Sequence, residues 1–549
     1  MNDITFAGQR EALSNFSPAG GTMHLESVGV GRTTVDSRVV YGADTRFGRE
    51  VSVGPRYFIG GVILIMLVGF ALRVWNLGGA SLWTDEALTA VRADAPFRQS
   101  LASIMAAGNQ SPLYFWAMRL VPHSTDMLLR LPSALMGLLG IGLMMLIVVR
   151  LYRDREMALW AGALLAVNPF HVWLSRTARP YSMLFVLGLL VSYFFLMLLR
   201  GNRTRAMWVG FTISSMVAYS THFTTVALPA AQYVLFAFML REKHGFFRRW
   251  IIAQAVAAAP ALFWVYIVLR QPMAIASEWI PRPGLRDIPL TLWNMTLGYD
   301  GVFKWHMVPG LMVVTLGIVL GMGYALQERR TNRKNFLWLW LVVVPFFPIF
   351  IMSKYVVSIY VDRYFTVLLP GVLLLIIWGW MHYSRQVWRI ALGIMVATGV
   401  YVVLFSFYDG SFRRADWRQA ADYVAEQVQP GDAIMLDRDN ALEAFSHYYG
   451  VNEHVLSSPT PCTIVLLSST PDTAPIERNA TRIWVVYHNP NEDVHRMGLM
   501  PDFDPFDPKL TPMGAWLSAR RDEVVAQQSF HGVRVLLVDP HQPSMAQGQ

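Results

Sequence analysis

The sequence contains a single cysteine, Cys462, and few charged residues for its length. Only 15% of its 549 residues are Asp, Glu, Lys or Arg, whereas soluble domains contain about 25%. One cysteine excludes an internal disulfide, so an oxidising compartment is neither required nor excluded. The shortage of charge excludes an ordinary soluble globule and a disordered chain. The sequence also lacks internal repeats and low-complexity tracts.

Hydrophobic residues, in contrast, make up 54% of the sequence, and its mean hydropathy is +0.36. The formal net charge of +9 could indicate a nucleic-acid partner. The basic residues, however, lie mostly in short clusters between long apolar runs, which is typical of a multispanning membrane protein. We therefore expect a protein that is embedded in membrane lipid and binds no nucleic acid.

The apolar runs predict about eleven transmembrane helices, since each helix needs roughly 20 apolar residues to cross the bilayer. Residues 1–56 precede the first run and are polar, which predicts a disordered cytoplasmic tail. The uncharged run 207–240 is too long for one span and is expected to break near 219–224. The expected spans are 57–77, 131–150, 157–175, 181–200, 206–220, 223–240, 250–270, 306–327, 335–353, 364–384 and 389–408.

Arginine and lysine gather at every second connection between these spans, and this alternation sets the orientation. Because positive charge stays on the cytoplasmic side, the basic connections and the N-terminus are expected there. The apolar stretch Tyr114–Val121 fits this scheme only as a helix lying in the membrane interface. The basic connections follow the spans that end near residues 150, 200, 240, 327 and 384. The outward segments are 78–130, 176–180, 219–224, 271–305, 354–363 and the chain after about 409.

After Tyr408 the composition becomes that of a soluble domain. Short apolar runs predict strands and alternate with two helical patterns, 416–428 and 514–529, so residues 409–549 are expected to form a small extracytoplasmic α/β domain. The stretch Pro501–Pro512 is rich in Asp and Pro and predicts a loop. The expected strands are Ala433–Leu436, Thr463–Leu467, Arg482–Tyr487 and Val533–Val538.

Two adjacent carboxylates, Asp85 and Glu86, follow the first span. A carboxylate at the edge of the bilayer can accept a proton from a hydroxyl nucleophile, so both are candidate catalytic residues. They could instead hold a divalent cation. A third interpretation is structural, with Asp85 capping the helix that follows it. The pair alone does not decide among the three.

The other outward connections carry cations and aromatic hydroxyls, although this side of a membrane protein is usually poor in Arg and Lys. Guanidinium groups bind phosphate oxygens through forked, charge-assisted hydrogen bonds. One arginine alone could instead reach lipid headgroups, and a lone histidine could be a packing residue. Because all of these residues fall at the same membrane face as the carboxylates, they favour a site for an anionic leaving group and a hydroxyl acceptor, as in phosphoryl-linked sugar transfer. The candidate phosphate-binding residues are Arg176, Arg179, Tyr181, His222, Lys354, Arg363 and Tyr364.

A series of short motifs runs along the chain: Ser81–Glu86, Ser111–Tyr114, Arg130–Leu135, Asn168–Phe170, Arg176–Met183, Thr221–His222, Arg363–Tyr364 with Pro370, Asp416–Arg418 and Pro430–Asp432. In this order the motifs resemble those of bacterial membrane glycosyltransferases. The similar family is glycosyltransferase family 39 with its protein mannosyltransferase-like relatives, within the GT-C superfamily. The resemblance covers about residues 57–436.

This resemblance implies a mainly α polytopic protein with the GT-C fold that takes a sugar from a polyprenyl-phosphate carrier. The acceptor would be a hydroxyl of a lipid, glycan or protein at the outer face of the bacterial plasma membrane. In this family an acidic residue at the position of Asp85 is regarded as the base or the acceptor-binding group. Glu86 would support it or bind sugar hydroxyls, and some of the cations would neutralise the departing lipid phosphate. We expect no certain cofactor, with a divalent cation left open.

The chain departs from the family pattern at two places. Many relatives have a His-Pro-Pro sequence where this chain has Asn109-Gln110-Ser111-Pro112. Protein mannosyltransferases have a further acidic residue where this chain has Arg179-Pro180-Tyr181. The second departure favours transfer to a lipid or glycan over protein mannosylation. It also weakens the case for a metal held by two separated acidic motifs.

Two other functions fit a polytopic protein with a soluble domain. A lipid-linked sugar transporter or flippase would bury polar groups near the bilayer midplane and show inverted repeats, whereas here the charges collect at one face. A scaffold would act through residues 410–549. The transferase hypothesis has a strict geometric requirement, because Asp85 must lie close to the arginines of the later connections.

Overall fold

The computed structural model describes residues 53–107, 110–122, 124–239, 244–270, 280–298, 305–328, 333–405, 415–436, 439–450, 463–466, 473–488, 503–509 and 512–541. Nearly all of the predicted cytoplasmic tail, 1–56, lies outside these residues, as do Cys462 and parts of the outward connection 271–305.

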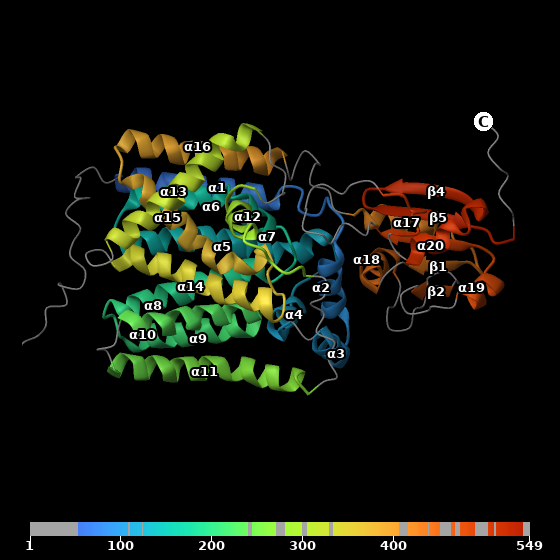
Figure 1. The fold of residues 1–549 in the computed structure, drawn as a ribbon, viewed down its shortest axis with the longest axis horizontal. Coiled ribbons are helices and arrows are strands. Elements are labelled where there is room, and N and C mark those ends of the chain that lie inside the picture. Colours follow the sequence, from blue (N-terminus) through green and yellow to red (C-terminus); the bar gives the residue numbers. More distant parts are fainter. Residues whose placement is uncertain are drawn as a thin grey trace, which may run out of the picture. The chain divides into compact units, whose positions relative to one another are not determined.

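The membrane part of the chain is a bundle of helices (Figure 1), and each predicted span coincides with a helix or a pair of consecutive helices. Within the described residues, seven helices are long and apolar enough to cross a membrane, or eight if the bent pair α6–α7 is one span. The protein is therefore a multi-pass membrane protein. The elements are α1 (Pro55–Val74), α5 (Asp126–Tyr152), α6 (Arg155–Ala166), α7 (Pro169–Ser175), α8 (Tyr181–Leu199), α9 (Arg205–Thr221), η3 (Phe223–Val226), α10 (Ala227–Met239), α11 (His244–Val268), α12 (Asp287–Thr296), η4 (Trp305–Met307), α13 (Val308–Gln327), α14 (Arg333–Tyr355), η5 (Asp362–Leu368), α15 (Leu369–Met381) and α16 (Arg385–Val403).

Two of the spans are interrupted, and the sequence predicted only one of the interruptions. The run 207–240 breaks as expected, because His222 is extended between α9 and η3. The expected span 157–175 is a bent pair, since α6 and α7 meet at an angle of 63°, and the sequence did not predict this bend. The cause is local: Pro169 cannot donate a backbone hydrogen bond, and the Asn168 side chain accepts one from the His171 N–H (2.8 Å) and starts a new helix.

The connection 78–130, which the sequence predicts to face outward, is itself helical. It forms α2 (Thr84–Asp94), α3 (Phe97–Ala107) and α4 (Pro112–Met118), the last of which covers most of the predicted interfacial helix Tyr114–Val121. Trp83 holds the N-cap position of α2, so the interpretation of Asp85 as the cap is wrong. Asp85 and Glu86 lie instead in the first turn, where the helix dipole stabilises negative charge.

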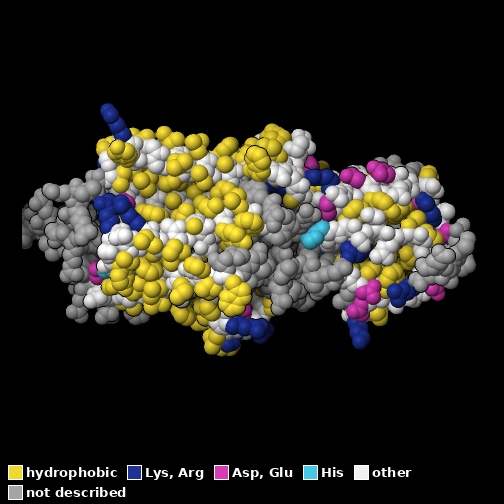
Figure 2. Space-filling view, turned by 90° about the horizontal axis from the view of Figure 1, so that it is seen from above, with side chains coloured by type: hydrophobic (Ala, Val, Ile, Leu, Met, Phe, Trp, Pro, Cys, Tyr) yellow, Lys and Arg dark blue, Asp and Glu magenta, His cyan; other side chains and the backbone are white. Residues whose placement is uncertain are grey.

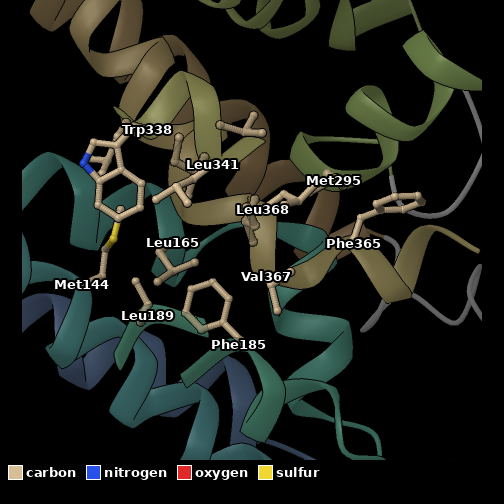
Figure 3. Packing of buried hydrophobic residues seen from close by; sticks show 14 of the residues in the cluster. Met144, Leu165, Phe185, Leu189, Met295, Trp338, Leu341, Phe365, Val367 and Leu368 are labelled. Carbon is tan, nitrogen blue, oxygen red and sulfur yellow. The ribbon is translucent and has the colours of Figure 1, made fainter. Parts of the chain in front are cut away.

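The hydrophobic core of the bundle surrounds α15 and the end of η5 that leads into it. All residues of α15 are buried. Figure 3 shows Phe185 of α8 and Leu165 of α6 in the same cluster as Val367 and Leu368 of η5. A segment packed on all sides has little freedom to move. Arg363 and Tyr364 also belong to η5, so their side chains are attached to a rigid backbone.

The surface of the bundle agrees with a lipid environment. Figure 2 shows hydrophobic side chains over almost all of the visible bundle, with Lys and Arg gathered at its ends, while the sheet domain mixes polar and charged groups. Large apolar side chains such as Leu64, Phe263 and Val319 are more than half exposed. In water such a surface would promote aggregation, whereas in a bilayer it contacts the lipid chains.

The C-terminal residues form the predicted α/β domain around a five-stranded sheet with strand order β2-β1-β3-β5-β4. β1 pairs in parallel with β2 and β3, whereas β5 pairs antiparallel with β3 and β4. The elements are α17 (Trp417–Gln427), β1 (Ala433–Leu436), α18 (Asp439–Tyr449), β2 (Thr463–Leu466), α19 (Ala474–Asn479), β3 (Ile483–His488), α20 (Pro512–Ser518), η7 (Arg521–Glu523), β4 (Val524–Phe530) and β5 (Val533–Val538).

The predicted helix 514–529 is wrong in its second half. The helix ends at Ser518, and β4 follows as an edge strand that forms a hairpin with β5. The turn contains Gly532 at a φ of 72°, a backbone conformation that glycine adopts without strain. The pairing with β5 decides the structure of this segment. The pattern of residues within 514–529 alone contains no information about that pairing.

Candidate active site

Asp85 lies against the connection 176–180, as the transferase hypothesis requires. Its Oδ2 is 3.6 Å from Nη2 of Arg179, and Nη1 of Arg179 donates to the backbone carbonyl of Asp85 at 3.2 Å. The Asp85 side chain is 27% exposed, whereas that of Arg179 is only 7% exposed. The carboxylate therefore remains accessible to a substrate while its cationic partner is embedded in the protein.

Glu86 points into the protein and is fully buried. Arg130 of α5 donates to both of its oxygens, from Nε to Oε1 at 2.8 Å and from Nη2 to Oε2 at 2.7 Å. The N–H of Ala178 adds a third hydrogen bond to Oε1 at 2.8 Å. Arg130 also donates to the carbonyls of Leu77, Ala80 and Ser81. Glu86 thus joins α2 to α5 and to the connection 176–180, which fits a supporting role better than sugar binding.

We expect Glu86→Gln to destabilise the protein by about 3–5 kcal/mol, because it leaves the Arg130 guanidinium buried without the anion to which it is hydrogen-bonded. Thermal unfolding of the purified protein in detergent measures the loss. Asp94→Asn is the matched control, since Asp94 is an exposed carboxylate on the same helix and should change stability by less than about 0.5 kcal/mol. Equal melting curves for the two variants would contradict the structural role of Glu86.

Four of the predicted phosphate-binding residues come together beside Arg179. Nε of Arg363 donates to the Tyr181 hydroxyl at 3.0 Å. The His222 ring centroid lies 4.8 Å from that of Tyr364 and 6.0 Å from that of Tyr181. These residues come from α8, the α9–η3 junction and η5, three segments that are far apart in the sequence.

Arg179 is the most deeply placed cation of this cluster. Its Nε is buried and has no hydrogen-bond partner, so the guanidinium is only partly satisfied. Burial is the largest single influence and opposes its charged form, but Asp85 together with Tyr181 and Tyr364 outweighs burial and the repulsion from Arg363, so the pKa of Arg179 is raised. The group therefore stays charged, and its buried Nε–H is an unused hydrogen-bond donor.

His222 cannot contribute charge to this site. Burial, together with the nearby Arg179 and Arg363, lowers the pKa of His222 to about 3. Its Nδ1 lies 2.8 Å from the Thr224 hydroxyl. At neutral pH the imidazole is therefore neutral, which argues against the expectation that it neutralises a lipid phosphate. Hydrogen bonding and packing remain open to it.

The two other predicted cations have different surroundings. Arg176 donates to the carbonyls of Trp75 (2.8 Å), Asn76 (3.2 Å) and Arg73 (3.3 Å), at the C-terminal end of α1. This is a C-cap, a common use of arginine. The Lys354 ammonium lies 5.5 Å from the Tyr355 ring centroid, in the last turn of α14. Neither contact links its residue to Asp85.

Arg92, which the sequence analysis did not single out, belongs to this region. It is 2% exposed and lies 4.9 Å from the ring centroid of Phe115, while Arg179 lies 5.8 Å from the same ring. Burial and Arg179 lower the pKa of Arg92 to about 10. The signal was present, because Arg92 follows Asp85 by seven residues and so shares its helix face. Hydrogen bonds to Ser103 and Gln110 hold the guanidinium in place.

Among the residues that the structure describes, no group of three or more His, Cys, Asp or Glu side chains is arranged to hold a metal ion. The divalent cation that the sequence leaves open stays a hypothesis.

Two solved structures of ArnT from Cupriavidus metallidurans share the fold of this chain. The form bound to undecaprenyl phosphate is 14% identical with a TM-score of 0.53, and the match covers 90% of this chain and 98% of that one. The apo form is also 14% identical with a TM-score of 0.56, over 87% and 98%. A match to the Archaeoglobus fulgidus oligosaccharyltransferase in complex with zinc and sulfate has a TM-score of only 0.46, which does not establish a shared fold. No family model and no curated protein matches the sequence.

The chain therefore shares the fold of the ArnT structures, which confirms the expected mainly helical, polytopic architecture with a small C-terminal α/β domain. At 14% identity the similarity establishes the architecture alone, because one fold can host several chemistries. Substrates must be argued from the site.

Proposed function

We propose that this protein is a glycosyltransferase that moves a sugar from a polyprenyl-phosphate donor to a hydroxyl acceptor. The acceptor is a lipid, a glycan or a protein, and the reaction takes place at the outer face of the bacterial plasma membrane. The observation that carries the proposal is the pair formed by Asp85 and Arg179, a partly exposed carboxylate 3.6 Å from a buried guanidinium with an unused donor.

The proposed reaction is a direct displacement at the anomeric carbon. The acceptor oxygen forms a bond to that carbon, and its proton passes to the Asp85 carboxylate. The bond from the anomeric carbon to the phosphate oxygen breaks, and polyprenyl phosphate leaves with the electron pair. Arg179 and Arg363 face the charge that develops on the phosphate, and preorganised cations of this kind are usually the largest catalytic term.

The surroundings of the site support an anionic ligand. Arg92, Arg179 and Arg363 converge on the region of Asp85, and Glu86 is already bound to Arg130. Positive charge therefore exceeds the negative charge that these side chains supply. The similar ArnT structure holds undecaprenyl phosphate, which supports a lipid phosphate as the anion.

The proposed orientation places the N-terminus in the cytoplasm and the C-terminal domain outside it. The alternation of basic connections along the sequence supports this orientation.

The test is to incubate the purified protein with a panel of polyprenyl-phosphate sugars and an extract of membrane lipids and glycans. We expect one donor to be consumed, with release of polyprenyl phosphate and of a glycosylated product. The same panel in sealed liposomes reports movement across the bilayer. Transport of a donor without loss of its sugar would contradict the proposal and favour a flippase.

A further inference from the structure

The motif Asp416–Arg418 has no part in the proposed chemistry. It contacts, however, the residues that lead into α2, the helix that carries Asp85. The Ser81 hydroxyl donates to Oδ1 of Asp416 at 2.9 Å, and the N–H of Arg418 donates to the Ser81 Oγ at 3.3 Å. Nη2 of Arg418 reaches the carbonyl of Gly78 at 3.1 Å. The first turn of α17 thus holds the backbone that leads into α2.

Tyr448 of α18 makes a second connection at the same place. Its hydroxyl accepts a hydrogen bond from the Leu82 N–H at 2.7 Å and donates one to Oδ2 of Asp126 at 2.5 Å. Leu82 precedes Asp85 by three residues, and Asp126 is the first residue of α5. One phenol therefore links the C-terminal domain to both the beginning of α2 and the beginning of α5.

Asp126 is the anchor of this arrangement. It is 8% exposed, and its described side-chain hydrogen bonds and ion pairs are with residues of the C-terminal domain. Besides Tyr448, these are Arg418, at 2.6 Å from Oδ2, and His447, at 3.5 Å from Oδ1. A buried carboxylate with hydrogen-bond donors on both oxygens holds its partners in a fixed geometry.

Apolar packing continues the contact along α2. Ala87 and Ala90 of α2 and Ala441 and Ala444 of α18 are buried in one cluster with Phe445. Small side chains let two helices approach closely, and Figure 1 shows α18 beside α2. α2 is therefore held from two sides, by α18 and by the contacts of Asp85 and Glu86 with the connection 176–180.

We propose that Tyr448 and Asp126 are positioning residues that set the location of α2, and with it the Asp85 carboxylate, relative to Arg179. The inference rests on the proposed function of Asp85. It assigns the C-terminal domain a role in catalysis that does not require any of its residues to touch substrate. Misplacement of a catalytic group by about 1 Å can cost two orders of magnitude in rate.

The first test is hydrogen exchange of α2, which is independent of activity. Tyr448→Phe removes the acceptor of the Leu82 N–H and keeps the ring, so exchange of the segment 82–90 should accelerate about fivefold or more. Asp126→Asn should have the same effect, because it weakens the anchor without changing its size. Tyr423→Phe is the control: it removes a hydroxyl from α17, on the same domain, keeps the ring that packs on Trp484 and Phe530 of the sheet, and should leave this exchange unchanged.

The second test is kinetic, with the donor that the wild-type protein consumes. Tyr448→Phe should lower kcat about 10- to 100-fold and change the donor KM less than about twofold, because Arg179 and Arg363 are untouched. A merely structural role would lower the amount of active protein for all substrates but would not accelerate exchange in α2 selectively. Wild-type exchange and wild-type kcat in Tyr448→Phe would overturn the inference while the proposed function stands. A wild-type protein that transfers no sugar would reject the proposed function, and exchange would still decide the positioning role.

Discussion

Asp85→Asn is expected to lower the rate of sugar transfer by about a thousandfold. An amide keeps the size of the carboxylate but cannot accept a proton from the acceptor hydroxyl at neutral pH. The fold should persist, because the hydrogen bond from Arg179 to this residue goes to the backbone carbonyl, which the substitution keeps. The measurement is kcat with the preferred donor at saturating acceptor, on protein shown to be monodisperse in detergent.

Asp94→Asn again provides the control for this experiment, since Asp94 lies on α2 at an exposed position. Its kcat should equal that of the wild-type protein. Donor affinity should fall little in Asp85→Asn, because removing a negative charge beside Arg179 does not weaken the attraction for phosphate. Near-normal turnover by the purified Asp85→Asn protein would remove Asp85 from the role of base.

Much of the fold could be predicted because a bilayer imposes a simple rule on sequence. Every predicted span coincides with a helix or a pair of consecutive helices, since backbone groups in lipid must be satisfied within the segment. The two differences from the expected elements have different causes. The bend at Asn168–Pro169 starts from the local Asn168 cap and Pro169, and buried Arg73 adds hydrogen bonds to the carbonyls of Leu165 and Ala166 at the end of α6. The strand β4 depends on its pairing with β5.

The sequence indicated which residues gather at the candidate site, but not which of them are buried and which stay exposed. Asp85 and Glu86 are neighbours in the sequence, yet on a helix consecutive side chains point about 100° apart. One therefore stays partly exposed beside Arg179, while the other is buried on Arg130. Likewise His222 occupies the expected place, but burial and two guanidinium groups remove its charge. Such effects depend on the tertiary neighbours, which no motif specifies.

The same division separates the two arginines of the second connection, which the sequence analysis treats alike. Arg179 lies beside Asp85 with an unused donor, whereas Arg176 binds the terminal carbonyls of α1. We expect Arg179→Ala to lower kcat/KM for the donor by about a hundredfold, the usual cost of removing one preorganised electrostatic contact. Arg176→Ala should leave this value within about threefold and act mainly on stability, because losing a cap costs about 1 kcal/mol.

Binding of polyprenyl phosphate, measured by native mass spectrometry in detergent, separates these outcomes from effects on the chemical step. Arg179→Lys is the informative second variant, since it keeps the charge but loses the forked guanidinium and should recover only part of the affinity. Arg363→Ala should weaken binding as Arg179→Ala does, because both cations face the same phosphate in the proposed mechanism. If Arg179→Ala and Arg176→Ala bind the lipid phosphate equally well, the anion does not sit where the buried guanidinium points, and the donor must approach Asp85 from another side.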